Sequence, residues 1–319
     1  ESGNRPCYIA NGARFLHTPR VLTTPSYSAY VKISDGCDNR CTYCAIPLIR
    51  GRYASRPFED IVEECRALAD QGVTEITLIA QDTSRYGCDL GDGHYLLPEL
   101  LEAVSAIEKV HWVRVLYCYP DSTEDRLLDT IARLPKVAKY LDLPLQHIND
   151  ELLIQMNRRG TSEWIRSRID ECHRRGLLVR TTMIVGFPGE TDEDFADTYR
   201  FLERLAPAFL HIFPYSARPD TPAAGFPNQV PPPVVERRAA ELGALSERLH
   251  RTFYEKQVGT QARVLWESTR RNGYMYGYTG NYVKVRTPFD RALINTITPV
   301  KLTATDGEEV MDAAILSRE

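Results

Sequence analysis

Short apolar runs alternate with amphipathic segments six times along most of the chain. Each run is followed by a loop and then by helical spacing, as where Ile61, Cys65 and Leu68 recur at i, i+4 and i+7. This alternation predicts parallel strands joined by helical crossovers. Six units are fewer than the eight of a closed barrel, so we expect an α/β fold with an open, six-unit (β/α) partial TIM barrel. Strands are predicted at 29–34, 73–80, 112–118, 140–145, 178–185 and 209–213, and helices near 57–71, 96–108, 122–134, 149–175, 192–205 and 233–255.

The periodicity changes after the last predicted helix. Short β-type runs at 262–266, 274–278, 282–286 and 294–298 are separated by turn residues. They predict a small antiparallel β-barrel over 257–319 that follows the barrel domain at 29–256. Residues 1–28 are rich in Gly, Pro, Asn and Thr, which predicts a lead-in or linker.

Composition is that of an ordinary globular protein, with 43% hydrophobic and 26% charged residues among 319. No run approaches the ~18 apolar residues of a membrane span, so we expect no membrane partner. The net charge of −4 argues against broad binding to nucleic acid. Eight cysteines, three of them within eight residues, favour metal ligation in a reducing compartment, which predicts a cytoplasmic protein.

The three clustered cysteines are Cys37, Cys41 and Cys44, spaced C-x3-C-x2-C directly after the first predicted strand. Three thiolates on one tight loop can bind three irons of a [4Fe–4S] cluster and leave the fourth iron open for a small ligand. A structural zinc ion is the alternative. Zinc generally takes four protein ligands, and no second Cys/His pair stands at matching spacing.

Further candidate residues follow the other predicted strands, whose carboxyl ends bind ligands in parallel barrels. Gly186 allows a close approach of backbone to ligand. Glu190 has an equally good interpretation as an anion at a helix N-terminus. Arg180, at the start of the fifth strand, can pair with a ligand carboxylate or belong to a structural ion pair, and a lone histidine is more often part of the scaffold. The full set is Gln81, Asp121, Gln146, His147, Arg180, Gly186 and Glu190.

The cysteine spacing, with the aromatic Tyr43 before the third cysteine, resembles the radical S-adenosylmethionine superfamily. The resemblance implies that the open iron binds the methionine moiety of S-adenosylmethionine. An electron from a reducing donor then cleaves the sulfonium to a 5′-deoxyadenosyl radical. It also implies a cofactor-binding role for Tyr43, whose backbone would contact adenine, and for Gln81, Gln146, Arg180, Gly186 and Glu190.

Longer strings resemble the methylthiotransferase family, namely CAIPLIRG at 44–51, IVGFPGET at 184–191 and YSARPDTPA at 215–223. AQDTSRYG at 80–87 and YLDLPLQH at 140–147 are similar to its RimO branch. That branch implies methylthiolation of the β-carbon of an aspartate in a small-subunit ribosomal protein. Asp121 and His147 are our candidates for contact with that substrate. The terminal segment resembles the family's substrate-recognising TRAM barrel.

A tRNA-modifying, MiaB-like enzyme is the first alternative. The terminal segment carries eight basic and seven acidic residues, which makes a weak electrostatic surface for RNA, so nucleic acid is not the expected primary partner. A non-catalytic, zinc-containing binding module is the second alternative.

The family holds a second [4Fe–4S] cluster on three cysteines of an N-terminal domain, and no such triplet occurs here. Cys7 stands alone, Cys65 and Cys172 lie on apolar helix faces, and Cys88 and Cys118 are isolated. We therefore expect a truncated enzyme that lacks this domain, cleaves the cofactor and cannot complete methylthiolation.

Overall fold

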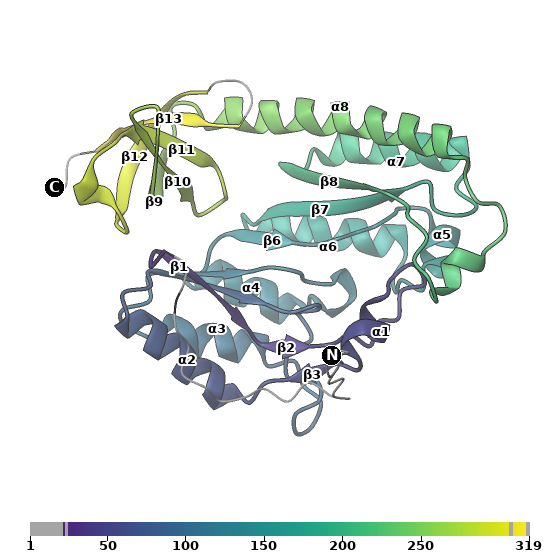
Figure 1. Cartoon of the computed structure of the whole chain (residues 1–319), viewed down its shortest axis with the longest axis horizontal. Helices are drawn as coiled ribbons and strands as arrows, with labels where there is room; N and C mark the ends of the chain where they lie inside the picture. Colours follow the sequence, from purple (N-terminus) through teal and green to yellow (C-terminus); the bar gives the residue numbers. More distant parts are fainter. Residues whose placement is uncertain (1–21, 23–24, 306–308, 317–319) are drawn as a thin grey trace, which may run out of the picture.

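The computed structural model describes residue 22, residues 25–305 and residues 309–316 (Figure 1). Most of the predicted lead-in, including Cys7, lies outside the described residues. In the part of the chain that the structure describes, no helix combines the length and the apolar character needed to cross a bilayer.

Six parallel strands follow one another in chain order and form the open barrel that the sequence predicts. They build two three-stranded sheets, ordered β1-β4-β5 and β6-β7-β8. Backbone hydrogen bonds join the two sheets, since the Cys118 N–H donates to the Asp142 carbonyl and the Ala138 N–H to the Val113 carbonyl, both at 2.9 Å. The strands are β1 (Ser28–Lys32), β4 (Glu75–Ile79), β5 (Trp112–Val115), β6 (Tyr140–Asp142), β7 (Leu178–Val185) and β8 (Phe209–Pro214).

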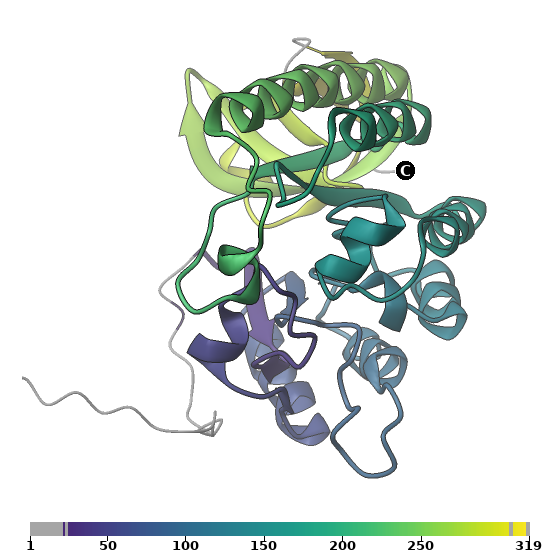
Figure 2. The ribbon, with the colours of Figure 1, turned by 90° about the vertical axis from the view of Figure 1, so that its right-hand side faces the viewer.

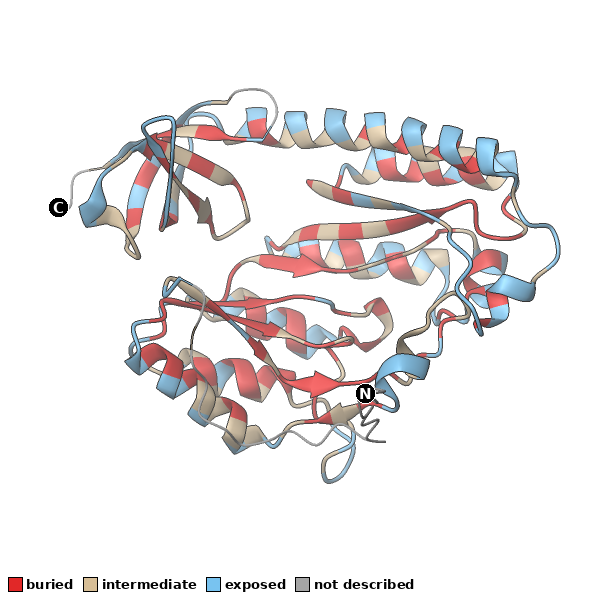
Figure 3. Ribbon diagram, viewed as in Figure 1, coloured by how far each residue is buried: buried red, intermediate tan, exposed pale blue. Residues whose placement is uncertain are grey.

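Helices cover the outer face of these strands and bury their apolar sides against them (Figure 3). The predicted stripe of Ile61, Cys65 and Leu68 is almost fully buried. Thr191 and Asp194 form a reciprocal capping box at the start of α7, which anchors the chain just after the loop that ends β7. The helices are α2 (Phe58–Asp70), α3 (Leu97–Ser105), α4 (Asp125–Arg133), α5 (Asp150–Gln155), α6 (Ser162–Arg174), α7 (Asp192–Leu205) and α8 (Pro232–Gln257).

The single helix predicted at 149–175 is wrong, because the chain forms two helices there. Asn157 and Gly160 between them adopt φ of 54° and 88°, a conformation that ends a right-handed helix. The Thr161 hydroxyl then accepts a hydrogen bond from the Trp164 N–H and starts α6. Short elements that the periodicity missed are α1 (Ile46–Arg50), β2 (Ser34–Asp35) and β3 (Ala54–Ser55).

The terminal segment closes into a five-stranded barrel, which lies at one end of the long helix α8 in Figure 1 and behind that helix in Figure 2. The strand order is β10-β11-β13-β12-β9, and β11 pairs with β13 in parallel. The predicted small β-barrel is confirmed, and one of its five strand pairs is parallel rather than antiparallel. A closed ring with an odd number of strands cannot alternate direction throughout, so one parallel pair is unavoidable. The strands are β9 (Gln261–Arg271), β10 (Tyr274–Thr279), β11 (Lys284–Pro288), β12 (Ile297–Thr305) and β13 (Met311–Ile315).

The turn between β10 and β11 fastens the small barrel to the amino ends of the large barrel's strands. Arg114, a buried residue of β5, donates to the carbonyls of Thr279 and Gly280 at 2.8 and 2.9 Å. Its Nε also donates to Glu75 Oε2 at 2.7 Å, and its guanidinium lies 4.0 Å from the centre of the Tyr282 ring. The small barrel therefore blocks the amino ends and leaves the carboxyl ends of the strands for a functional site.

Candidate functional site

The three clustered cysteines face one cavity of about 380 Å³ at the carboxyl ends of the strands. They lie on the loop between β2 and α1, with Cys37 and Cys41 buried and Cys44 half-buried. Gly36 begins this loop at φ +74°, and a Cβ there would lie 2.1 Å from the Arg52 carbonyl oxygen. Only glycine therefore allows the two sides of the loop to approach this closely.

Backbone hydrogen bonds fix the cysteine loop on its far side. The Thr42 N–H donates to the Met156 carbonyl at 3.1 Å, and the Ala223 N–H donates to the Thr42 carbonyl at 3.0 Å. The Asn157 amide adds bonds to the carbonyls of Asn39 and Arg40. The loop is thus held against the end of α5, and the thiols have defined positions before any ligand binds.

Burial disfavours the charged form of two of the three thiols. Burial raises the pKa of Cys37 to about 11 and also raises the pKa of Cys44. Such thiols become thiolates when a metal ion compensates their charge. In the described ranges, no three His, Cys, Asp or Glu side chains are grouped as ligands of one ion. Three thiols around one cavity, which Asp38 and Asp220 also line, match a [4Fe–4S] cluster held by three cysteines.

Tyr43 is brought together with the loop that follows β7. Its ring packs edge-on against Phe187 with centroids 6.4 Å apart. Gly186 has φ +76°, and a Cβ there would lie 2.4 Å from a methyl carbon of Val235, so glycine is required at this turn. Tyr43 and Gly186, predicted from separate motifs, are thus joined through one aromatic contact.

Glu190 has a structural role in this geometry. Its Oε2 accepts hydrogen bonds from the N–H groups of Gly186 and Phe187 at 2.5 and 3.3 Å. Its Oε1 lies 3.1 Å from Arg238 Nη1, and the two side chains are only 1% and 3% exposed. The carboxylate points into the loop and to α8, so the predicted contact with the cofactor is not supported.

Gln81 and Gln146 remain candidate ligand-binding positions at the strand ends. Gln81 Oε1 is buried and has no hydrogen-bond partner among the described residues. Gln146 adopts φ of 72°, and its backbone bonds to Thr182 and Ile184 of β7 on both sides at 2.8 Å. An unpaired buried acceptor and a strained backbone are both features that accompany ligand sites.

Arg180 lies far from the cysteine loop. It is the third residue of β7, and the chain needs four more residues, about 13 Å of strand, to reach Ile184 beside the cofactor loop. Its electrostatic partners are Tyr140 and Asp142 on the neighbouring strand. Arg180 Nε is buried with no hydrogen-bond partner among the described residues, and the predicted contact with the methionine carboxylate stays a prediction.

The structure leads to different conclusions for His147 and Asp121, the two residues predicted to contact the substrate. His147 is 1% exposed, and its Nδ1 accepts a hydrogen bond from the Asn149 N–H at 3.0 Å. Burial lowers the pKa of His147 to about 4, so it is a neutral scaffold residue and the predicted substrate contact is not supported. Asp121 is half-buried in a 3₁₀ turn (Pro120–Ser122) at the carboxyl end of β5 and stays a candidate.

Asp82 is a supporting residue that the sequence analysis missed. Its two carboxylate oxygens accept hydrogen bonds from Asn39 Nδ2 at 2.7 Å and Ser84 Oγ at 2.8 Å. The Tyr53 hydroxyl donates to its carbonyl oxygen at 3.1 Å. This fully buried network ties the cysteine loop to the end of β4. A carboxylate directly after a buried strand was the available signal.

The remaining described cysteines do not join the site. Cys65, Cys118 and Cys172 are fully buried, as expected of small apolar side chains. Cys88 is half-buried, and its electrostatic neighbours include Arg85 and Asp89.

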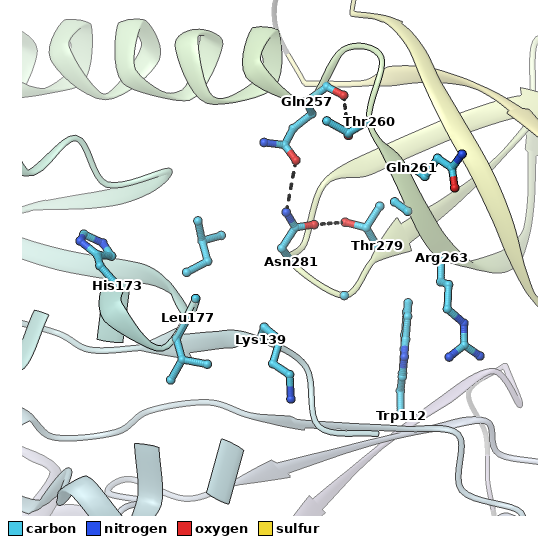
Figure 4. A pocket seen from close by; sticks show the side chains of 14 residues that line it. Trp112, Lys139, His173, Leu177, Gln257, Thr260, Gln261, Arg263, Thr279 and Asn281 are labelled. Carbon is cyan, nitrogen blue, oxygen red and sulfur yellow. Dashed lines mark hydrogen bonds between the residues drawn. The ribbon is translucent and has the colours of Figure 1, made fainter. Parts of the chain in front are cut away.

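A second cavity, of about 530 Å³, lies at the opposite end, between the two barrels (Figure 4). Its basic residues diverge, because Lys139 Nζ is bonded to carbonyls at the end of α4 while Arg263 lies on β9. We assign the functional site to the cysteine cavity, where the chemistry-bearing side chains converge.

These features define an α/β-barrel protein of the class that holds an iron–sulfur cluster at the carboxyl ends of its strands. The sequence profile of the Radical SAM superfamily matches residues 31–202, more than half of the chain. The chain belongs to the radical SAM superfamily.

The chain is also similar to curated relatives. It is 45% identical over 259 residues to the ribosomal protein uS12 methylthiotransferase RimO of Alkaliphilus oremlandii, covering 81% of this chain and 59% of that protein. It is 44% identical over 253 residues to RimO of Desulforamulus reducens, covering 79% and 57%. The chain thus spans less than two thirds of the length of these relatives.

Two solved structures share the fold. Coproporphyrinogen III oxidase (HemN) from Escherichia coli aligns with a TM-score of 0.51 at 14% identity, covering 90% of this chain and 71% of that one. The radical S-adenosylmethionine methyltransferase TsrM from Kitasatospora setae aligns with a TM-score of 0.51 at 20% identity, covering 61% and 38%. Both similarities concern the fold.

Proposed function

We propose that this chain carries the radical chemistry of a methylthiotransferase that modifies an aspartate of ribosomal protein uS12. The observation that carries the proposal is the convergence of Cys37, Cys41 and Cys44 on one cavity at the strand ends. The similarity to RimO proteins over about four fifths of the chain supports the choice of reaction and substrate.

The three cysteines would hold a [4Fe–4S] cluster as thiolates. When bound, the cluster supplies the electron that cleaves S-adenosylmethionine to a 5′-deoxyadenosyl radical. Tyr43 and the turn at Gly186 would border the cofactor, since Phe187 joins them at one side of the site. The buried Gln81 Oε1, which has no hydrogen-bond partner among the described residues, would be available as an acceptor for the cofactor. The rest of the loop contributes rigidity, because its backbone is already bonded to the barrel.

The chain's own residues also constrain the substrate. The closed terminal barrel has nearly balanced charge, with eight basic and seven acidic residues in 257–319, which favours a protein over RNA. Asp121, at the carboxyl end of β5, is the candidate for substrate contact. Reduction of the cluster requires an external electron donor, and a reductant of the cytoplasm would serve.

The test begins with anaerobic reconstitution of the chain with iron and sulfide. Reduction with dithionite in the presence of S-adenosylmethionine should yield 5′-deoxyadenosine, with about four irons bound per chain. Cys41→Ala should abolish both signals, whereas Cys65→Ala, which removes a buried thiol on α2, should leave both intact. A colourless chain that binds zinc and yields no deoxyadenosine would contradict the proposal.

Substrate choice is tested separately. A uS12 peptide that contains the target aspartate should bind the reconstituted chain with weak dependence on salt. Preferential binding of tRNA, with affinity falling steeply as salt rises, would instead identify an RNA substrate. Iron content and the mass of the recovered peptide show whether this chain completes the methylthio transfer.

A further inference from the structure

A buried arginine lies beside the cysteine loop with no carboxylate to balance it. Arg158 follows α5 and is 8% exposed. Its Nη2 donates to the Pro144 carbonyl at 2.5 Å, while Nη1 is buried without a hydrogen-bond partner among the described residues. No Asp or Glu of the described ranges forms an ion pair with it, although ion pairs surround many other arginines of this chain.

Arg158 is linked to one cysteine through an aromatic ring. Its guanidinium lies 4.0 Å from the centre of the Tyr119 ring. The Tyr119 hydroxyl in turn lies 3.0 Å from Cys41 Sγ. The ionisable groups that interact most strongly with Arg158 are Tyr119, Tyr43 and Cys41, so every such neighbour belongs to the site.

A buried cation is retained in proteins when an opposite charge balances it. Here the anion would be a cluster bound through the Cys41 thiolate. We propose that Arg158 is a positioning residue that acts through Tyr119 and Cys41 to stabilise the reduced, more negative state of the cluster. The proposal concerns one electron accepted from an external reductant, with no proton and no covalent bond involved.

The physical basis is the dependence of cluster potentials on nearby charge and on hydrogen bonds to the sulfur ligands. A fixed positive charge favours the reduced form, and so would the Tyr119 hydroxyl when it donates to a Cys41 thiolate. Removing either should make the cluster harder to reduce.

Arg158→Gln tests the charge, and Arg159→Gln is the matched control, because Arg159 is the adjacent residue and is exposed. The measurement is the midpoint potential of the reconstituted chain, followed by electron paramagnetic resonance at equal iron content. We expect Arg158→Gln to lower the reduction equilibrium constant at least tenfold, a shift of about 59 mV for one electron. Arg158→Lys, which keeps the charge, should recover most of the shift, and Arg159→Gln should leave the potential unchanged.

Tyr119→Phe tests the contact between the Tyr119 hydroxyl and Cys41 Sγ. It also tests the proposal if Arg158→Gln fails to fold or to bind iron. It retains the ring under Arg158 and removes only the hydroxyl at Cys41, so the potential should fall by a smaller amount. Potentials equal to that of the unmodified chain in the loaded variants would overturn the proposal. Weaker binding of S-adenosylmethionine at an unchanged potential would also overturn it and would make Arg158 a cofactor-binding residue.

Discussion

The ion pair between Arg238 and Glu190 offers a direct test of how the cofactor loop is supported. Arg238→Met keeps the length of the side chain and removes its charge. The variant loses the contact with Glu190 Oε1 at 3.1 Å, the hydrogen bond to the Glu190 carbonyl at 3.1 Å and the ion pair with Asp192 at 2.9 Å. Both side chains are almost fully buried, so water does not replace the lost cation. Leaving a buried carboxylate unpaired should lower the free energy of unfolding by about 3–5 kcal/mol.

The neighbouring Arg237 is a matched control. It also pairs with Asp192, at 2.9 Å, but the two side chains are 54% and 78% exposed. Solvent screens such a pair, so Arg237→Met should change the free energy of unfolding by no more than about 1 kcal/mol.

The penalty should also depend on pH. Burial raises the pKa of Glu190 from 4.5 to about 7 in the folded chain, so protonation favours folding. This contribution is complete below the unfolded value and is lost as pH rises through the folded value. Because Arg238 lowers this pKa, its removal moves the pKa upward. The variant should therefore continue to lose stability above pH 7, where the unmodified chain levels off.

Urea unfolding of the metal-free chain at pH 6 and pH 8, under reducing and anaerobic conditions, measures both effects. The difference between Arg238→Met and the unmodified chain should be larger at pH 8. A penalty no greater than that of Arg237→Met, or one that does not grow with pH, would refute the assignment of Glu190 to loop support.

Three further substitutions test other parts of the structure. Gly36→Ala places a Cβ 2.1 Å from a carbonyl oxygen and should abolish iron binding. The control Gly72→Ala, at φ +92° with no atom within 4 Å of the new Cβ, should still bind iron. Equal iron contents in the two variants would contradict the geometry of the cysteine loop. Asp82→Ala removes the acceptor of the hydrogen bond between the cysteine loop and the end of β4. It should lower the iron content and should lower the free energy of unfolding, measured by urea titration, by about 1–3 kcal/mol. An unchanged iron content would contradict this role of Asp82. Arg114→Met leaves Glu75 unpaired and should lower the unfolding free energy by about 3–5 kcal/mol while the cysteine cavity still binds iron, so parallel loss of iron would argue against the separation of the two ends.

The strand and helix periods predicted most of the barrel because each element buries one face. The break at 157–160 was missed because apolar positions recur on both sides of it, although residues 157–163 include none, and only the backbone shows the positive φ at Asn157 and Gly160. The strand β13 was also missed. It is short and completes a ring whose closure depends on pairing with β11 and β12, which local pattern does not encode.

The candidate site was predictable where chemistry lies within one loop. The spacing of the cysteines alone predicted a shared site, and the three thiols do line one cavity. Their role as cluster ligands stays a prediction. The functions of single polar residues were harder to predict, because their partners lie elsewhere in the chain. Glu190 is held by Arg238, 48 residues away, and Arg158 lies beside Tyr119, whose hydroxyl contacts Cys41.

The open barrel leaves its inner face accessible between the two ends. In β1, Ala29 and Val31 join the core under the helices, so the intervening Tyr30, which is 57% exposed, faces inward. Phe213 of β8 is 54% exposed on the corresponding face. A closed eight-stranded barrel would fill this space with side chains. Here the small barrel blocks the amino ends, so the proposed protein substrate would approach the cysteine cavity along this aromatic inner face or from the carboxyl ends.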